Sequence, residues 1–100
     1  MSLRLSFHQI PPNDALKSEC EERVRALQEE FPETTKFEVT VAHNGTEHET
    51  HVHLTGKEIE FAAHARGHDV RASLEEALEK ARRQLRKHHD KVIFAPRRRV

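Results

Sequence analysis

Hydrophobic and polar residues alternate at the start of the chain, where Arg4 and Ser6 separate Leu3, Leu5 and Phe7. A period of two residues is typical of a β-strand with one buried face and one exposed face. A pair of prolines follows shortly afterwards and interrupts the pattern. We therefore predict that the chain begins with a half-buried strand.

The next stretch, residues 14–31, has the longer period of a helix. Its apolar side chains recur at spacings of four and three residues, at Leu16, Cys20, Val24, Leu27 and Phe31. This spacing predicts an amphipathic helix with one apolar stripe. Asn13 is a suitable N-cap, Asp14 lies at the positive end of the helix dipole, and Pro32 stops the helix. Because Cys20 lies within the stripe, we expect a small core residue rather than a nucleophile.

Alternation returns in three further segments, residues 36–43, 47–55 and 58–66, which we predict to be strands. The dipeptides Asn44-Gly45 and Gly56-Lys57 separate these segments and are typical of tight hairpin turns. Turns centred on these dipeptides predict the following pairs: Val39 with Thr50, Phe37 with Val52, Leu54 with Ile59, and Val52 with Phe61. In this register the apolar residues of all three strands share one face of the sheet.

A second helix follows Asp69, which is a suitable N-cap. Its apolar stripe consists of Val70, Leu74, Ala77, Leu78, Ala81 and Leu85. The predicted order is β-α-β-β-β-α, an α+β fold with a four-stranded mixed sheet. We expect both helices to cover the sheet face that carries Phe7, Phe37 and Phe61, and the other face to remain open. Residues 1–91 then form one domain, and residues 92–100 a basic C-terminal tail.

Charge changes the picture near the C-terminal end of the second helix. The chain is neutral as a whole, with 17 basic and 17 acidic residues, but residues 79–91 (EKARRQLRKHHDK) hold six Lys or Arg and two acids. A solvated helix end, whose cations suit the helix dipole, explains such a cluster without any function. A surface that binds RNA phosphates explains it as well, and six cations exceed what a helix end needs.

These cations form two ridges on the predicted helix. Helical spacing places Lys80, Arg83, Lys87 and Lys91 on one ridge, and Arg82, Arg86 and His89 on the other. Three further arginines, Arg97–Arg99, follow in the tail. We favour the phosphate-binding interpretation.

The histidines raise the question of a metal site. His51 and His53 lie two residues apart on a predicted strand, and His64 belongs to the next strand, so all three should reach the open face. Two such histidines and a third ligand can hold zinc, although an exposed strand face also tolerates histidines without any function. We keep His51, His53 and His64 as candidate ligands and predict no metal.

Motifs for catalysis are absent from the sequence. We find no Gly-rich phosphate loop, nucleophile elbow or paired-carboxylate motif, so we predict no enzyme, no cofactor and no small-molecule substrate. No apolar run is long enough to span a membrane and no signal peptide is recognisable, so we expect a soluble cytoplasmic protein.

The aromatic residues restrict how the protein could bind RNA. The chain has five Phe and neither Tyr nor Trp, and Phe7, Phe31, Phe37 and Phe61 all fall at core positions. The open sheet face therefore lacks rings on which bases could stack. We expect RNA to be bound through charge and shape, along the helices and the sheet edge.

The predicted order of elements and the sequence DVRASLEEALEKARRQLRKHHDK at residues 69–91 carry a resemblance to a known family. The chain resembles the ribosome hibernation-promoting factors and ribosome-associated inhibitors, also called sigma-54 modulation proteins, over residues 3–91. The resemblance implies a fold like that of double-stranded-RNA-binding domains. It also implies a non-catalytic protein that docks on the small ribosomal subunit, in the channel for messenger and transfer RNA, and silences translation under stress.

The resemblance also implies which residues contact ribosomal RNA. Residues of the second helix match the family's basic pattern: Lys80, Arg83, Arg86, Lys87 and Lys91. Arg82 belongs to the same basic segment, and the further candidates are Arg4, Lys57, Arg66 and Arg71. Arg71 departs from the family, which commonly has an aromatic residue at this place. The sequence also ends without the second domain of long family members, so it is either a short-type member or a part of a longer one.

Three alternatives remain open at this point. The first is a general binder of double-stranded RNA, the second is a His-rich metal-binding module, and the third is a protein-interaction domain that modulates a transcription factor.

Overall fold

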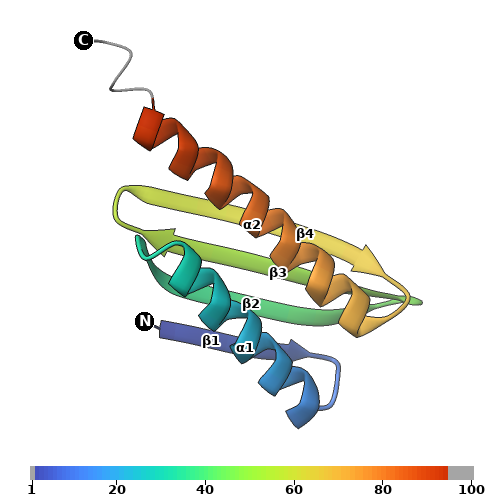
Figure 1. Cartoon of the computed structure of the whole chain (residues 1–100). Helices are drawn as coiled ribbons and strands as arrows, with labels where there is room; N and C mark the ends of the chain where they lie inside the picture. Colours follow the sequence, from blue (N-terminus) through green and yellow to red (C-terminus); the bar gives the residue numbers. More distant parts are fainter. Residues whose placement is uncertain (1, 95–100) are drawn as a thin grey trace.

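The computed structural model describes the backbone of residues 2–94 and the side chains of residues 3–88 except that of Asn44. The chain forms the elements β1 (Ser2–His8), α1 (Asp14–Glu30), β2 (Thr34–Asn44), β3 (Glu47–Gly56), β4 (Ile59–Gly67) and α2 (Val70–Phe94). This order is the predicted β-α-β-β-β-α (Figure 1). Helical backbone continues to Phe94, so α2 extends past the proposed domain boundary at residue 91.

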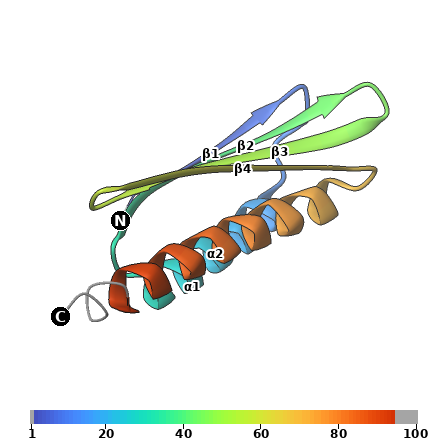
Figure 2. The ribbon, with the colours of Figure 1, turned by 90° about the horizontal axis from the view of Figure 1, so that it is seen from above.

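The four strands form one mixed sheet in the order β1-β2-β3-β4. Strand β1 is parallel to β2, whereas β2–β3 and β3–β4 are antiparallel. Figure 2 shows both helices on the same side of the sheet, with the other side uncovered. The predicted two-layer arrangement is therefore confirmed.

Both helices begin with the predicted caps. The side chain of Asn13 accepts a hydrogen bond of 3.1 Å from the backbone N–H of Leu16. The carboxylate of Asp69 accepts one of 3.3 Å from the backbone N–H of Arg71. Each cap satisfies a backbone donor that has no partner within its own helix.

The core lies between the sheet and the two helices. The predicted α1 stripe is buried throughout, and so is the α2 stripe except for Val70, which is half-buried. The sheet contributes Phe37, Val39, Val41, Val52 and Leu54 as buried side chains. Phe7 and Phe61 lie on the two outermost strands and are half-buried against the same core.

One buried polar contact joins the sheet to α2. The hydroxyl of Ser73 donates to the carbonyl of Val70 at 2.9 Å, and its oxygen lies 2.8 Å from the hydroxyl of Thr50. Because the Ser73 proton is already engaged, the Thr50 hydroxyl donates to Ser73. Both buried hydroxyl groups are thus satisfied.

The predicted hairpin registers are wrong by two residues. Val39 pairs with Val52 rather than Thr50, Phe37 with Leu54 rather than Val52, Leu54 with Phe61 rather than Ile59, and Val52 with Ala63 rather than Phe61. Each turn lies one residue later than predicted, at residues 45–46 and 57–58, and this moves every pair by two positions. A shift of two leaves each side chain on its own face, so the prediction of the buried face still holds.

The structure gives a physical reason for each turn. In the first turn the positive φ of 68° falls on Gly45, which adopts it without steric cost. Gly56 cannot be a turn centre in this fold because it ends β3 against the backbone of Glu33. A Cβ at Gly56 would approach the Glu33 carbonyl oxygen to 2.3 Å. The second turn therefore begins after Gly56, and Glu58 takes the positive φ of 61°.

Candidate nucleic-acid interface

The cations of α2 divide into two groups that face different ways. The first group consists of Arg82 and Arg86, which point toward the C-terminal end of α1. Glu30, the last residue of α1, accepts hydrogen bonds from Arg86 at 2.8 Å and from Arg82 at 3.3 Å. The bond from Arg86, supported by the charge of Arg82, lowers the pKa of the Glu30 carboxyl below its usual value. This half of the predicted basic surface therefore has a partner inside the protein.

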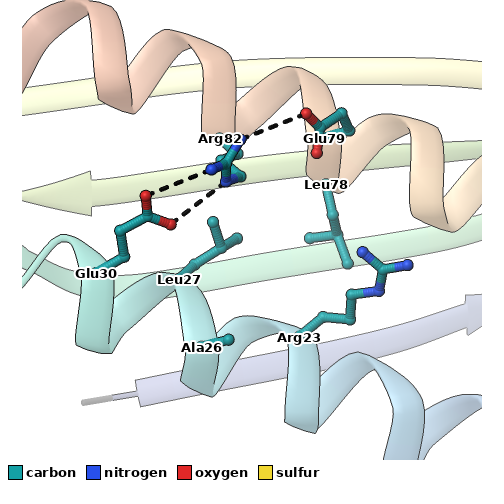
Figure 3. Close-up of a pocket in the computed structure, with 7 residues that line it drawn as sticks. All are labelled: Arg23, Ala26, Leu27, Glu30, Leu78, Glu79 and Arg82. Atoms are coloured by element: carbon teal, nitrogen blue, oxygen red, sulfur yellow. Dashed lines mark hydrogen bonds and ion pairs between the residues drawn. The ribbon is translucent and has the colours of Figure 1, made fainter.

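Figure 3 shows the Arg82–Glu30 part of this contact, beside a cavity between the helices. The cavity has a volume of about 210 Å³ and an apolar floor formed by Ala26, Leu27 and Leu78. Arg82 also lies 3.6 Å from Glu79 of its own helix. Arg82 is thus already paired with both acidic residues that line the cavity, Glu30 and Glu79.

Two further ion pairs join the helices. Arg71 donates to Glu19 at 2.8 Å, and Arg23 of α1 donates to Glu75 of α2 at 2.9 Å. The acidic residues of α1 therefore act as internal partners for α2. Sequence reasoning missed this role because these pairs join residues more than 50 positions apart.

The second group of α2 cations forms what we term the outer band, which consists of Lys80, Arg83 and Lys87. Arg83 is 72% exposed and lies 3.8 Å from Glu79. The ammonium group of Lys80 donates to the backbone carbonyl of His64 on β4 at 3.0 Å, which leaves two of its protons for other acceptors. Among the described side chains, neither Lys80 nor Lys87 has a carboxylate within ion-pair distance. Among the described cations of the basic segment, Lys80 and Lys87 are therefore available for an external anion, and Arg83 has only its contact with Glu79 of the same helix to lose.

The outer band continues along β4. Next to Lys80, the side chain of Gln84 donates to the carbonyl of Ala62 at 3.3 Å. Lys87 lines a hollow of about 210 Å³ together with Phe61, Gln84 and His88. The rings of Phe61 and His88 meet edge to face, with their centroids 5.7 Å apart. This contact was not predicted, because the sequence places one ring in the core and the other on a helix surface.

The remaining predicted RNA contacts are dispersed. Arg4 and Arg66 lie on the open sheet face, where Arg66 donates to Glu49 at 2.9 Å. Lys57 lies in the β3–β4 turn, at the end of the molecule toward which α2 runs (Figure 1). The side chain of Lys91 and the arginines Arg97–Arg99 lie outside the described residues.

The open sheet face carries the candidate metal ligands. His51 lies opposite His64, and the two rings stack with centroids 5.5 Å apart. His53 instead contacts two carboxylates, Glu60 at 2.7 Å and Glu38 at 3.4 Å. Hydrogen bonds that the protonated His53 imidazole donates, first to Glu60 and then to Glu38, raise its pKa. The structure thus stacks His51 on His64 and pairs His53 with carboxylates, while all three histidines line one hollow on this face.

No group of three His, Cys, Asp or Glu in the described part of the chain is arranged to hold a metal ion. A shallow hollow of about 350 Å³ does lie on this face, between β2, β3 and β4. The correct register would have revealed one partner of His53, because Glu38 lies directly opposite it.

Cys20 is fully buried in the core, as predicted. Burial raises the pKa of its thiol to about 12, with a smaller contribution from the nearby charges of Glu21 and Glu19. The thiol therefore stays protonated at neutral pH and cannot act as a nucleophile. Within residues 2–94, no helix combines the length and hydrophobicity that crossing a membrane would require.

Solved structures show the same fold. A ribosomal subunit interface protein from Coxiella burnetii superposes with a TM-score of 0.84 at 16% identity, over 91% of this chain and 100% of that chain. The N-terminal domain of Protein Y from Thermus thermophilus superposes with a TM-score of 0.78 at 12% identity, over 88% and 99% of the two chains. At such low identity the likeness concerns the fold alone.

Sequence comparison is more specific. A protein from Azotobacter vinelandii named ribosome hibernation promoting factor is 33% identical over 95 residues, which cover 93% of this chain and 87% of that protein. The pattern of the family described as sigma 54 modulation protein / S30EA ribosomal protein matches residues 3–93. The chain therefore belongs to the sigma 54 modulation protein / S30EA ribosomal protein family.

Proposed function

We propose that this protein is a non-catalytic ribosome-binding factor that docks on the small ribosomal subunit, near the channel for messenger and transfer RNA, and inhibits translation under stress. Membership in the family supports an association with ribosomes. The name of the Azotobacter relative supports hibernation as its purpose. The partners are ribosomal RNA and ribosomal proteins, and the place of action is the cytoplasm.

The observation that carries this proposal is the outer band. RNA phosphates attract any exposed cation. Arg82 and Arg86 must first break their ion pairs with Glu30 in order to bind a phosphate. Lys80 and Lys87 have no such ion pair to break among the described residues. The outer band should therefore supply the first phosphate contacts. Arg4, Lys57, Arg66, Arg71 and Lys91 are secondary contacts in this proposal.

The proposal predicts salt-dependent binding. If the three cations of the outer band each meet one phosphate, the logarithm of the affinity should fall with the logarithm of the salt concentration at a slope of about −2 to −3. Pelleting the protein with purified small subunits at several salt concentrations measures this slope. A slope near zero would contradict a phosphate-dominated interface.

Charge reversal locates the interface. The triple variant Lys80→Glu, Arg83→Glu, Lys87→Glu should lose pelleting with subunits. The matched control is Lys17→Glu, Arg25→Glu, Lys36→Glu, which makes the same change in charge at exposed positions outside α2. Thermal melts of both variants check the fold. Equal pelleting of the triple variant and the wild type would show that α2 is only a solvated helix.

Pelleting of the wild-type protein with small subunits, with and without competing RNA duplexes, separates the alternatives. A His-rich metal-binding module and a domain that modulates a transcription factor both predict no cosedimentation with subunits. A general binder of double-stranded RNA predicts that RNA duplexes compete with subunits for the protein.

A further inference from the structure

The hollow between α2 and β4 combines a phenylalanine ring and a histidine ring with neighbouring cations. Its lining consists of Phe61, Gln84, Lys87 and His88. Arg83, an exposed member of the outer band, precedes Gln84 on the same helix. The hollow therefore lies within the proposed phosphate-binding surface.

The position of Phe61 explains why an aromatic ring is accessible here. Phe37, on a central strand, is completely buried, whereas Phe61 lies on the outermost strand and is half-buried. One side of the Phe61 ring packs on the core, and the ring of His88 meets it at an angle of 72°. Both rings line the hollow, so part of each ring is accessible to a third ring that enters it.

These groups match the chemistry of an unpaired nucleobase. Bases that leave the RNA stack are held by aromatic side chains, and their edges form hydrogen bonds. Gln84 uses its amide N–H₂ on the Ala62 carbonyl, and its own carbonyl oxygen remains an acceptor. Lys87 and Arg83 would meet the phosphates of the same nucleotide and its neighbour.

We propose that the Phe61–His88 hollow holds one unpaired base of ribosomal RNA while the outer band holds the adjoining phosphates. This inference rests on the proposed function and adds a recognition element to it. Among its described side chains the open sheet face carries no Phe, Tyr or Trp, although His51 and His64 stack on each other there, whereas the opposite side of β4 carries the Phe61 ring. A site of this kind favours loops and bulges over continuous double helices, because only unpaired bases can enter it.

The test compares two substitutions of half-buried phenylalanines on outermost strands. Phe61→Leu keeps an apolar side chain against the core but removes the ring, and Phe7→Leu makes the same change on β1. We expect Phe61→Leu to weaken binding to small subunits about 5- to 150-fold, the range that loss of one stacked base produces. Phe7→Leu should bind as the wild type does, and the salt slope should remain unchanged in both variants.

His88→Ala provides a second variant. The side chain of His88 lies on the helix surface, so its removal should disturb folding less than a change at Phe61 does. His88→Ala should also weaken binding, whereas Phe61→Tyr, which keeps the ring, should retain it. Wild-type affinity of both Phe61→Leu and His88→Ala would overturn this inference alone. Failure of the wild-type protein to pellet with subunits would overturn this inference together with the proposed function.

Chemical probing of the subunit RNA decides whether the hollow holds a base or a side chain of a ribosomal protein. The wild type should protect at least one unpaired base that Phe61→Leu leaves reactive. If Phe61→Leu lowers affinity without changing the reactivity of any base, the occupant is a protein side chain and the inference is wrong.

Discussion

Arg86 donates a hydrogen bond of 2.8 Å to the carboxylate of Glu30, and this bond joins the middle of α2 to the last residue of α1. The C-terminal end of a helix carries a partial negative charge, and the last turn of α1 contains no basic residue to balance it. Arg86 and Arg82 supply that balance from the neighbouring helix. Part of the positive charge of α2 therefore serves the fold, whereas the described cations of the outer band have no partner on α1.

The substitution Glu30→Gln should release these arginines. Arg82 and Arg86 would then be available to RNA phosphates, so we expect tighter binding to small subunits and a steeper salt dependence. The melting temperature should change little, because an exposed ion pair contributes little and a negative charge leaves the unfavourable end of α1. Glu29→Gln is the control, since Glu29 is an exposed neighbour. An unchanged affinity would show that Arg82 and Arg86 lie outside the interface.

His53 should make stability depend on pH above its ordinary pKa of 6.5. Its pKa is raised in the folded protein, so the folded state binds the proton more tightly than the unfolded state does. The resulting stabilisation is present in full below pH 6.5 and is lost as the pH rises through the folded-state pKa. The stability difference between the wild type and His53→Gln should therefore shrink between pH 6 and pH 8.

Calorimetric melts of both proteins across this range measure that difference. Measurements should stay above pH 5.5, because Glu30 and Glu49 have lowered pKa values and lose their own stabilising effect as the pH falls through the acid range. A difference that does not vary with pH would contradict the role of Glu60 and Glu38.

The Thr50–Ser73 contact should respond asymmetrically to mutation. Ser73→Ala leaves the buried Thr50 hydroxyl without an acceptor, which should cost about 1–3 kcal/mol of unfolding free energy. Thr50→Val removes the donor but leaves Ser73 bonded to Val70, so it should cost less. In the double variant, Thr50→Val should relieve part of the cost of Ser73→Ala. Denaturant unfolding of the three variants tests this order, and additive costs would contradict it.

Gly56 and Gly67 offer a matched pair of glycine substitutions. A Cβ at Gly56 would lie 2.3 Å from the Glu33 carbonyl oxygen and 2.8 Å from the side chain of Ile59, whereas the nearest atom at Gly67 would be 3.7 Å away. Gly56→Ala should therefore destabilise the protein by about 1–3 kcal/mol, as overpacking does. Gly67→Ala should change stability by only about 0.5 kcal/mol. Equal effects in denaturant unfolding would rule out the close approach to Glu33.

Removal of divalent metals should change neither folding nor subunit binding. The core is apolar, and His53 is held by carboxylates rather than by the pair His51 and His64. Melting curves and subunit pelleting with and without a chelator test this expectation. A cooperative loss of structure in chelator would instead establish a structural metal site.

The sequence was sufficient to predict the order of elements, both helix caps and the buried face of each strand. It was not sufficient for the register, because a period of two is unchanged when a strand shifts by two residues. Val52 therefore faces the core in either register, although its partner changes from Phe37 to Val39. Only the contact of Gly56 with Glu33, which depends on the folded chain, fixes the second turn.

The basic segment was equally visible in the sequence, but the division of its charges was not. Arg82 and Arg83 are neighbours in the chain, yet only Arg82 faces Glu30. That difference depends on where α1 lies beside α2. The Phe61–His88 contact also required the packing of α2 along β4.

The hydrogen bonds from Lys80 to His64 and from Gln84 to Ala62 have a consequence for how the molecule meets its own copies. Unpaired carbonyls on an outermost strand can template the addition of a strand from another chain, the first step of edge-to-edge aggregation. Here α2 provides side chains that occupy two of those carbonyls, so an incoming strand must displace them. We therefore expect substitutions at Lys80 or Gln84 to affect self-association as well as the proposed binding to RNA.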